Sequence, residues 1–222
     1  MISAPVQDVQ GRTDSFGFVC SRCSRCCYDK IIQVNPYEVA RLGRSLGVTS
    51  GEFAARHTDQ GLGVHLTRRD DGACEFLGPQ GCTVHADRPL VCRLYPLGRH
   101  VSDDGSERFS RMTPHPQSEG EFTRDGTIAD YLQAQGAGPF MAAADAYFTW
   151  TCRAKAALDA AEDQDDLEDR LGEVDLLDMD AAIAQDCAAS GAPEPADIES
   201  RLELHLEILD RRLAEVEPGR QA

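Results

Sequence analysis

Apolar residues recur at helical spacing along the last part of the chain. From residue 198 they are separated by steps of four, four, three, four and three, which is typical of one buried helix face: Ile198, Leu202, Leu206, Leu209, Leu213 and Val216. Helical composition also marks residues 127–135, 139–160 and 166–185. We therefore predict a helix-rich second half, whose last helix docks on its own domain or pairs with another subunit.

The first half carries two helix-start signals after a short apolar run. Residues 30–34 (KIIQV) are rich in β-branched side chains and predict a strand. The NPYE sequence at 35–38 combines an Asn cap, a first-turn proline and a glutamate that reaches back, and TSGE at 49–52 repeats the capping pattern. Two short helices are expected to begin at these sequences.

Glycine, proline and aspartate interrupt the apolar pieces between residues 61 and 96, which predicts short strands and turns. One helical turn is expected to start at Pro89. The DDG sequence at 103–105 predicts a hairpin turn, and residues 113–120 are predicted to be loop.

Negative charge is concentrated in the helical second half. Residues 151–222 carry 20 acidic and 7 basic side chains, and therefore hold −13 of the net charge of −16. Such a chain repels nucleic-acid backbones and anionic membranes, which argues against binding to either. The acidic helices are either a solvated face or a surface for a basic protein partner.

No apolar run approaches the about 20 residues that span a bilayer. Residues 1–15 (MISAPVQDVQGRTDS) lack the basic and apolar regions of a secretion signal, and we expect them to be a flexible polar lead-in. We therefore expect a cytoplasmic protein. Thiols stay reduced there, and clustered cysteines bind metal more often than they form disulfides.

Seven of the nine cysteines crowd into two regions. Four lie in FVCSRCSRCCYD (18–29) and three between residues 74 and 92, and all seven are predicted metal ligands: Cys20, Cys23, Cys26, Cys27, Cys74, Cys82 and Cys92. An odd number of thiols, two of them adjacent, fits poorly with a disulfide framework. A tight turn, or a helix over 20–27, would place the first four sulfurs on one side. Seven exceed the four that zinc or one cubane needs, so either some are spare or there are two metal centres.

Other side chains near these thiols are candidates for supporting roles. Four arginines are predicted either to lower thiol pKa values and balance the charge of a cluster, or to form ordinary surface ion pairs: Arg22, Arg25, Arg88 and Arg93. His85, His115 and Cys152 are candidates for an eighth ligand. Cys152 and Cys187 stand in alanine-rich helical surroundings, where isolated cysteines usually pack as small apolar core residues.

The cysteine motifs resemble those of a known family. Cys20-x2-Cys23-x2-Cys26-Cys27 is followed by C-x-F-L at 74–77, G-C-x-V at 81–84 and R-P-x2-C-R-x-Y-P at 88–96. This series is similar to that of the CxxCxxCC family of zinc- or iron-chelating, YkgJ-like proteins. The resemblance covers residues 16–98 and implies a cytoplasmic bacterial metal-site protein. Members often have an eighth cysteine beyond the last motif, whereas none occurs here between residues 93 and 151.

Two alternatives to simple metal binding stay open. Flagellin lysine N-methylases carry a similar cysteine module, associated there with an iron–sulfur cluster, which implies a protein-modifying enzyme. The chain has no Gly-rich nucleotide loop, nucleophile elbow or HExxH motif that would favour an enzyme. The other alternative is an interaction module that zinc folds and whose acidic helices bind a partner.

Together these features predict an α+β fold, in which a small loop-rich, metal-centred domain with short strands is wrapped by helices from the C-terminal half. The expected segments are the lead-in over 1–15, a cysteine-cluster domain over 16–125, a helical region over 126–190 packing on it, and an acidic amphipathic helix over 191–222. The expected function is binding of an iron–sulfur cluster, of the 4Fe–4S type, or of zinc. We favour iron–sulfur because one dense run with three distant thiols fits a cubane better than two spaced pairs would.

Overall fold

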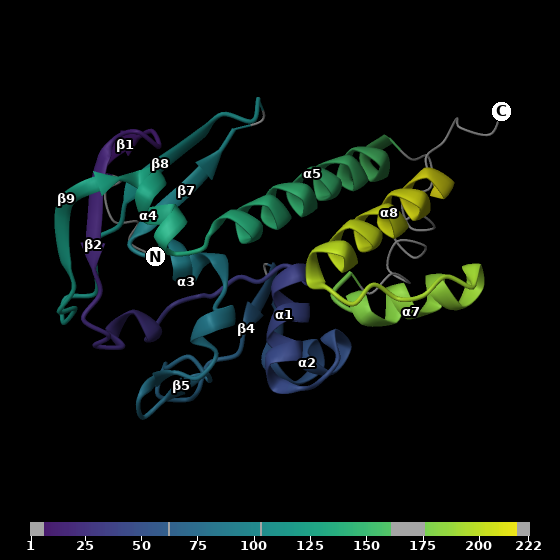
Figure 1. The fold of residues 1–222 in the computed structure, drawn as a ribbon, viewed down its shortest axis with the longest axis horizontal. Helices are drawn as coiled ribbons and strands as arrows, with labels where there is room; N and C mark the ends of the chain where they lie inside the picture. Colours follow the sequence, from purple (N-terminus) through teal and green to yellow (C-terminus); the bar gives the residue numbers. More distant parts are fainter. Residues whose placement is uncertain (1–6, 62, 103, 161–175, 217–222) are drawn as a thin grey trace. The chain divides into compact units, whose positions relative to one another are not determined.

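The chain forms two compact units in the computed structural model, which describes residues 7–61, 63–102, 104–160 and 176–216 (Figure 1). The first unit takes its described residues from Met1–Val34 and Asp59–Pro139, and the second takes them from Asn35–Thr58 and Phe140–Ala222. The seven predicted ligand cysteines all belong to the first unit. Cys152 and Cys187 belong to the second.

Short strands and short helices make up the first unit. They are β1 (Gln7–Gln10), β2 (Ser15–Val19), a 3-10 turn (Arg25–Cys27), β3 (Thr58–Gly61), β4 (Gly63–Leu66), β5 (Leu77–Gly78), β6 (Gly81–Cys82), a second 3-10 turn (His85–Asp87), α3 (Leu90–Leu94), β7 (Leu97–Val101), β8 (Glu107–Arg111), β9 (Glu121–Thr127) and α4 (Ile128–Ala134). The second unit is built mainly from α1 (Pro36–Leu46), α2 (Ser50–His57), α5 (Gly138–Ala160), α7 (Met179–Ser190) and α8 (Ile198–Val216). The predicted α+β fold class is confirmed. None of the described helices is both long enough and apolar enough to cross a bilayer.

Antiparallel pairs organise the first unit. β7 and β8 form a hairpin, β1 pairs with the other edge of β8, and β2 pairs separately with β9. The hairpin closes where Ser102 N–H donates to Ser106 O at 2.9 Å, and Gly105 there has φ 77°, a left-handed backbone that suits glycine. The predicted hairpin turn is confirmed, although residue 103 itself lies outside the described residues.

The N-terminal segment differs from the loose lead-in expected over residues 1–15. From Gln7 onward its described part is tied into two strand pairs, because β1 bonds to β8 and β2 begins at Ser15. The Arg12 guanidinium also pairs with the Glu107 carboxylate at 2.6 Å. A strand ladder uses backbone donors and acceptors, which every residue type carries, so the polar composition did not reveal it.

The strand predicted over 30–34 is reduced to one isolated bridge, between Gln33 and His65. The β-branched side chains Ile32 and Val34 are nevertheless buried. Leu66 N–H donates to Ile32 O at 2.9 Å. The apolar pattern in this segment therefore reflects burial beside β4 rather than a regular strand.

Aromatic side chains join β2, β9 and α4 in the first unit. Phe16 is fully buried and meets the Tyr131 ring edge-on at a centroid distance of 4.9 Å and the Phe122 ring at 6.0 Å. α4 begins at a capping box in which Thr127 accepts from Asp130 N–H. This confirms the helix predicted over 127–135 and places Tyr131 on the strand pair.

The helices α1 and α2 begin where the capping sequences predicted. The Asn35 side chain accepts from Glu38 N–H at 3.0 Å, and the Glu38 carboxylate accepts from Asn35 N–H at 2.9 Å. Thr49 and Glu52 form the same reciprocal box at α2. These contacts span three residues each, so they follow directly from the local sequence.

The apolar face of α8 is buried within its own unit. Leu209 and Leu213 are fully buried, and Ile198 nearly so. α7 begins at Met179 with the Asp178 carboxylate as its cap. Of the helix predicted over 166–185, the part up to residue 175 lies outside the described residues.

His205 should make the free energy of unfolding depend on pH. It is fully buried, and its Nδ1 lies 2.8 Å from the Tyr147 hydroxyl. Burial, aided by the charge of Arg212, lowers the pKa of His205 to about 4 against the opposing carboxylates of Asp178 and Asp180. The unfolded chain takes up this proton near pH 6.5 and the folded chain only near pH 4. The free energy of unfolding should therefore rise with pH across this window, by up to about 3 kcal/mol.

Urea unfolding measured at about pH 4.5 and about pH 7 tests this expectation, with the fluorescence of Trp150 as probe. Trp150 is the chain's single tryptophan and lies in the same unit as His205. A His205→Gln variant should lose most of the pH dependence. An equal change in wild type and variant would contradict the assignment to His205.

Candidate metal centre

The first cysteine run is a loop with left-handed residues, so the helical alternative for 20–27 is wrong. Arg22 and Ser24 have φ values of 55° and 60°. Only Arg25–Cys27 forms a 3-10 turn, which Cys27 N–H closes by donating to Ser24 O at 3.0 Å. Non-glycine residues seldom adopt this backbone, so we attribute the loop shape to its tertiary contacts.

Backbone hydrogen bonds hold the Cys74 segment against this loop. Cys74 N–H donates to Cys27 O at 2.8 Å, and Asp29 N–H donates to Gly72 O at 3.0 Å. Gly72 has φ 80°, and a Cβ there would collide with the Asp29 carboxylate. Glycine at 72 therefore permits the approach that brings Cys74 beside Cys27.

Two further segments supply Cys82 and Cys92. Cys82 pairs with Leu77 in the short ladder of β5 and β6, which begins three residues after Cys74. Cys92 lies in α3, where its N–H donates to Pro89 O at 2.9 Å. The proline that predicted a helical turn thus sets the position of a thiol.

Five thiols, which we call the inner thiols, influence one another electrostatically: Cys26, Cys27, Cys74, Cys82 and Cys92. Burial raises the pKa of Cys92 to about 12, and the charges of Cys74, Cys82 and Cys26 add to the rise. Burial is also the main cause of the raised pKa values of Cys74 and Cys82. Segments far apart in sequence therefore place their sulfurs within electrostatic reach of one another.

The side chains of Cys26 and Cys27 are hydrogen-bonded to each other. A hydrogen bond from Cys27 lowers the pKa of Cys26 to about 6, with help from the charge of Lys30. The same hydrogen bond, together with burial, raises the pKa of Cys27. The lowered pKa favours the thiolate form of Cys26, and the thiolate is the form that binds metal.

Cys20 and Cys23 are the first two thiols of the first cysteine run. Cys20 is exposed, and its sulfur accepts from Arg22 N–H at 3.4 Å. The pKa of Tyr95 is raised by burial first, and also by the charges of Cys26, Cys23 and Cys20, so this ring lies near both groups of thiols. Among the residues that the structure describes, no three His, Cys, Asp or Glu side chains are close enough together to hold an ion as they stand. The thiols are thus gathered without forming a finished coordination shell.

Arg93 has a role that the sequence did not predict. It is 6% exposed and donates to the backbone oxygens of Arg88 at 2.9 Å, Gln135 at 2.8 Å and Ala86. These bonds link the second 3-10 turn and the start of α3 to the end of α4. Its guanidinium therefore ties together the backbone beside the thiols, and the direct role of Arg93 in holding a cofactor stays a prediction.

The other predicted arginines lie among the ligand segments. The charge of Arg88 opposes the burial that raises the pKa of Cys82. Arg22 and Arg25 lie within the first cysteine run, and the charge of Arg22 contributes to a lowered pKa of His85, for which burial is the first cause. Arg88 thus acts on a thiol directly, whereas Arg22 acts on a neighbouring imidazole.

The candidates for an eighth ligand fall into different units. His85 and His115 belong to the first unit with the thiols, and His115 N–H donates to the Tyr95 hydroxyl at 3.0 Å. Cys152 belongs to the second unit and is exposed. The prediction that Cys152 packs in a core is therefore wrong. The buried face of α5 includes Tyr147, Trp150 and Ala154 at helical spacing, and Cys152 does not lie on that face. The same prediction for Cys187 is confirmed, since it is 5% exposed.

Sequence reasoning missed Lys30 beside the inner thiols. Its charge interacts with Cys26, Cys92 and Cys27, and its Nζ lies 3.2 Å from the centre of the Tyr95 ring. One signal was available, because Lys30 is one of only two lysines among 22 basic residues.

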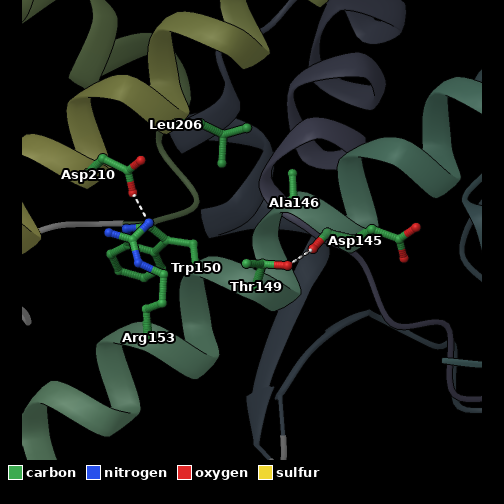
Figure 2. A pocket seen from close by; sticks show the side chains of 7 residues that line it. All are labelled: Asp145, Ala146, Thr149, Trp150, Arg153, Leu206 and Asp210. Carbon is green, nitrogen blue, oxygen red and sulfur yellow. Dashed lines mark hydrogen bonds and ion pairs between the residues drawn. The ribbon is translucent and has the colours of Figure 1, made fainter. Parts of the chain in front are cut away.

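A pocket in the second unit is chemically different. Figure 2 shows its lining side chains, which come from α5 and α8 and enclose about 340 Å³: Asp145, Ala146, Thr149, Trp150, Arg153, Leu206 and Asp210. Arg153 pairs with Asp210 at 2.8 Å across it. No cysteine or histidine is among these lining residues, so this pocket has no ligands for a soft metal.

Comparison with known proteins bears on the first unit. Residues 19–115 match the model of the CxxCxxCC family, which is described as a "Putative zinc- or iron-chelating domain". The matched range contains all seven clustered cysteines. No curated protein and no solved structure matches the chain.

Proposed function

We propose that the protein binds an iron–sulfur cluster or zinc through its seven clustered cysteines, because residues 19–115 match the model of the CxxCxxCC family. The observation that supports this proposal most directly is that Cys92 lies close enough to Cys74, Cys82 and Cys26 for their charges to add to the burial that raises its pKa. These thiols come from different segments, and soft sulfur ligands suit zinc and iron–sulfur clusters. A reducing cytoplasm is the compartment that we propose for such thiols.

The protonation of the inner thiols favours a bound cation. The pKa values of Cys74, Cys82 and Cys92 are raised, chiefly by burial, so without metal these thiols stay protonated at neutral pH. A metal ion or cluster supplies positive charge that favours the thiolate form of several cysteines at once. Binding should therefore release protons, and affinity should increase with pH.

The number of inner thiols bears on the kind of centre. Four thiolates satisfy one zinc ion or one cubane cluster, and five inner thiols with Cys20 and Cys23 leave three beyond that number. We favour a 4Fe–4S cluster, since its ligands commonly include a dense Cys-x2-Cys-x2-Cys run with one distant cysteine. Zinc in the same thiols is the alternative.

Isolation of the full chain without oxygen tests this function. We expect a brown solution with broad visible absorption and iron with acid-labile sulfide if a cluster is present. A colourless protein with bound zinc would select the zinc alternative. Elemental analysis that finds neither iron nor zinc, together with failure to bind either on reconstitution, would refute the proposed function.

A further inference from the structure

Lys30 stands out first by its residue type. The chain has twenty arginines and two lysines, Lys30 and Lys155. Lys155 lies on α5, is exposed and pairs with Asp159 one helical turn away, which is an ordinary surface arrangement. Lys30 instead follows the first cysteine run by three residues. At this position the chain has the compact ammonium group of lysine, whereas nearly all its other basic residues are arginines with a planar guanidinium group.

The position of the Lys30 ammonium group is well defined. Its Nζ lies 3.2 Å from the centre of the Tyr95 ring, which is a close cation–π contact. Three neighbours fix that ring and its backbone: the Tyr131 hydroxyl donates to Tyr95 O at 2.6 Å, His115 N–H donates to the Tyr95 hydroxyl, and Phe18 meets the ring edge-on. Tyr95 therefore forms a rigid base that holds the cation in one place.

This cation acts on the inner thiols. Burial lowers the pKa of Lys30, and negative charge on Cys26, Cys92 and Cys27 opposes that lowering. Burial of an ammonium group is costly unless negative charge or an aromatic face compensates for it. Lys30 has the aromatic face of Tyr95, and the thiolates of the site would supply the negative charge.

The charge balance of metal binding shows what this cation can do. When a divalent ion replaces the protons of four thiols, four protons leave and the complex carries two negative charges. A cubane core with two positive charges and four thiolates has the same net charge. A fixed positive charge nearby therefore stabilises the bound state more than the neutral, metal-free thiols.

We propose that Lys30 is a positioning residue of the metal centre, whose ammonium group, held on the Tyr95 ring beside Cys26, Cys27 and Cys92, offsets the negative charge of the thiolate complex and so increases its affinity for metal. This inference rests on the proposed function. It assigns a role to a residue outside the cysteine motifs.

Metal titration of four proteins tests the role of Lys30. The metal-free wild type, Lys30→Gln, Lys30→Arg and the matched control Lys155→Gln are titrated with cobalt(II) and then with zinc. The sulfur-to-cobalt charge-transfer bands report whether thiolates are the ligands. We expect Lys30→Gln to bind zinc about 10-fold more weakly, as for other residues that support metal ligands. Lys30→Arg should recover most of the loss, and Lys155→Gln should bind as wild type does.

Three other results would overturn the role of Lys30. If Lys30→Gln binds like wild type while Cys92→Ser binds metal much more weakly, the proposed function stands and the role of Lys30 is wrong. If Lys30→Gln and Lys30→Arg lose affinity equally, and both lower the melting temperature of the metal-free protein, Lys30 acts through packing alone. If the wild type binds neither cobalt nor zinc and accepts no iron–sulfur cluster, both the proposed function and the role of Lys30 are wrong.

Discussion

Replacement of Cys92 by serine is expected to weaken metal binding about 100-fold. Cys92 interacts with thiols from three other segments, so its loss removes a ligand at the point where these segments meet. If about 10–16 kcal/mol of apparent binding energy is shared by four thiolates, one ligand accounts for about 3 kcal/mol, or about 100-fold in affinity. Serine is close to cysteine in size, so the metal-free protein should keep its fold.

Cys152→Ser is the matched control, because Cys152 is exposed and belongs to the second unit. Metal content and zinc affinity are measured for both variants and for wild type. Unchanged metal binding in Cys92→Ser would remove Cys92 from the ligand set. Loss of binding in Cys152→Ser would instead identify Cys152 as a ligand that sequence spacing alone does not favour.

Replacement of Arg93 by methionine is expected to destabilise the first unit strongly, even without metal. Three backbone oxygens would lose the part-buried hydrogen bonds that Arg93 donates, and a hydrogen bond to a charged group contributes about 1.5–3 kcal/mol. We expect the free energy of unfolding of this unit to fall by about 3 kcal/mol or more. Lysine should not rescue it, since one ammonium group lacks the fork that reaches three acceptors.

Amide hydrogen exchange in the β7–β8 hairpin measures this change, because the hairpin belongs to the first unit. Trp150 fluorescence follows the second unit in the same samples and should be unaffected. The control Arg108→Met changes an exposed arginine on β8 and should alter stability by no more than about 0.5 kcal/mol. Equal exchange rates in Arg93→Met and wild type would contradict the structural role of Arg93.

The two predictions separate two properties of the site. Replacement of Cys92 removes a sulfur atom, so it should change the properties of the protein only when metal is present. Replacement of Arg93 removes contacts that hold the backbone around that sulfur, so it should lower the stability of the first unit with or without metal. Because Arg93 follows Cys92 directly in α3, one motif serves both purposes.

Local sequence determined the parts of this fold whose contacts span only a few residues. The capping boxes at Asn35 and Thr49 and the hairpin turn at Gly105 each form within one short segment, where side-chain chemistry and backbone preference act together. The apolar face of α8 likewise follows from helical spacing alone. The cysteine motifs predicted a soft metal site, since seven thiols at such density are typical of metal ligands.

Only the tertiary structure decided which groups meet. The bond between Cys74 and Cys27, the Lys30 ammonium on the Tyr95 ring and the reach of Arg93 to Gln135 each join segments separated by tens of residues. The exposure of Cys152 was decided in the same way, since helical composition does not say which face of α5 is covered. Such contacts depend on how whole elements pack, and packing energy depends on pairs of residues that no local pattern identifies.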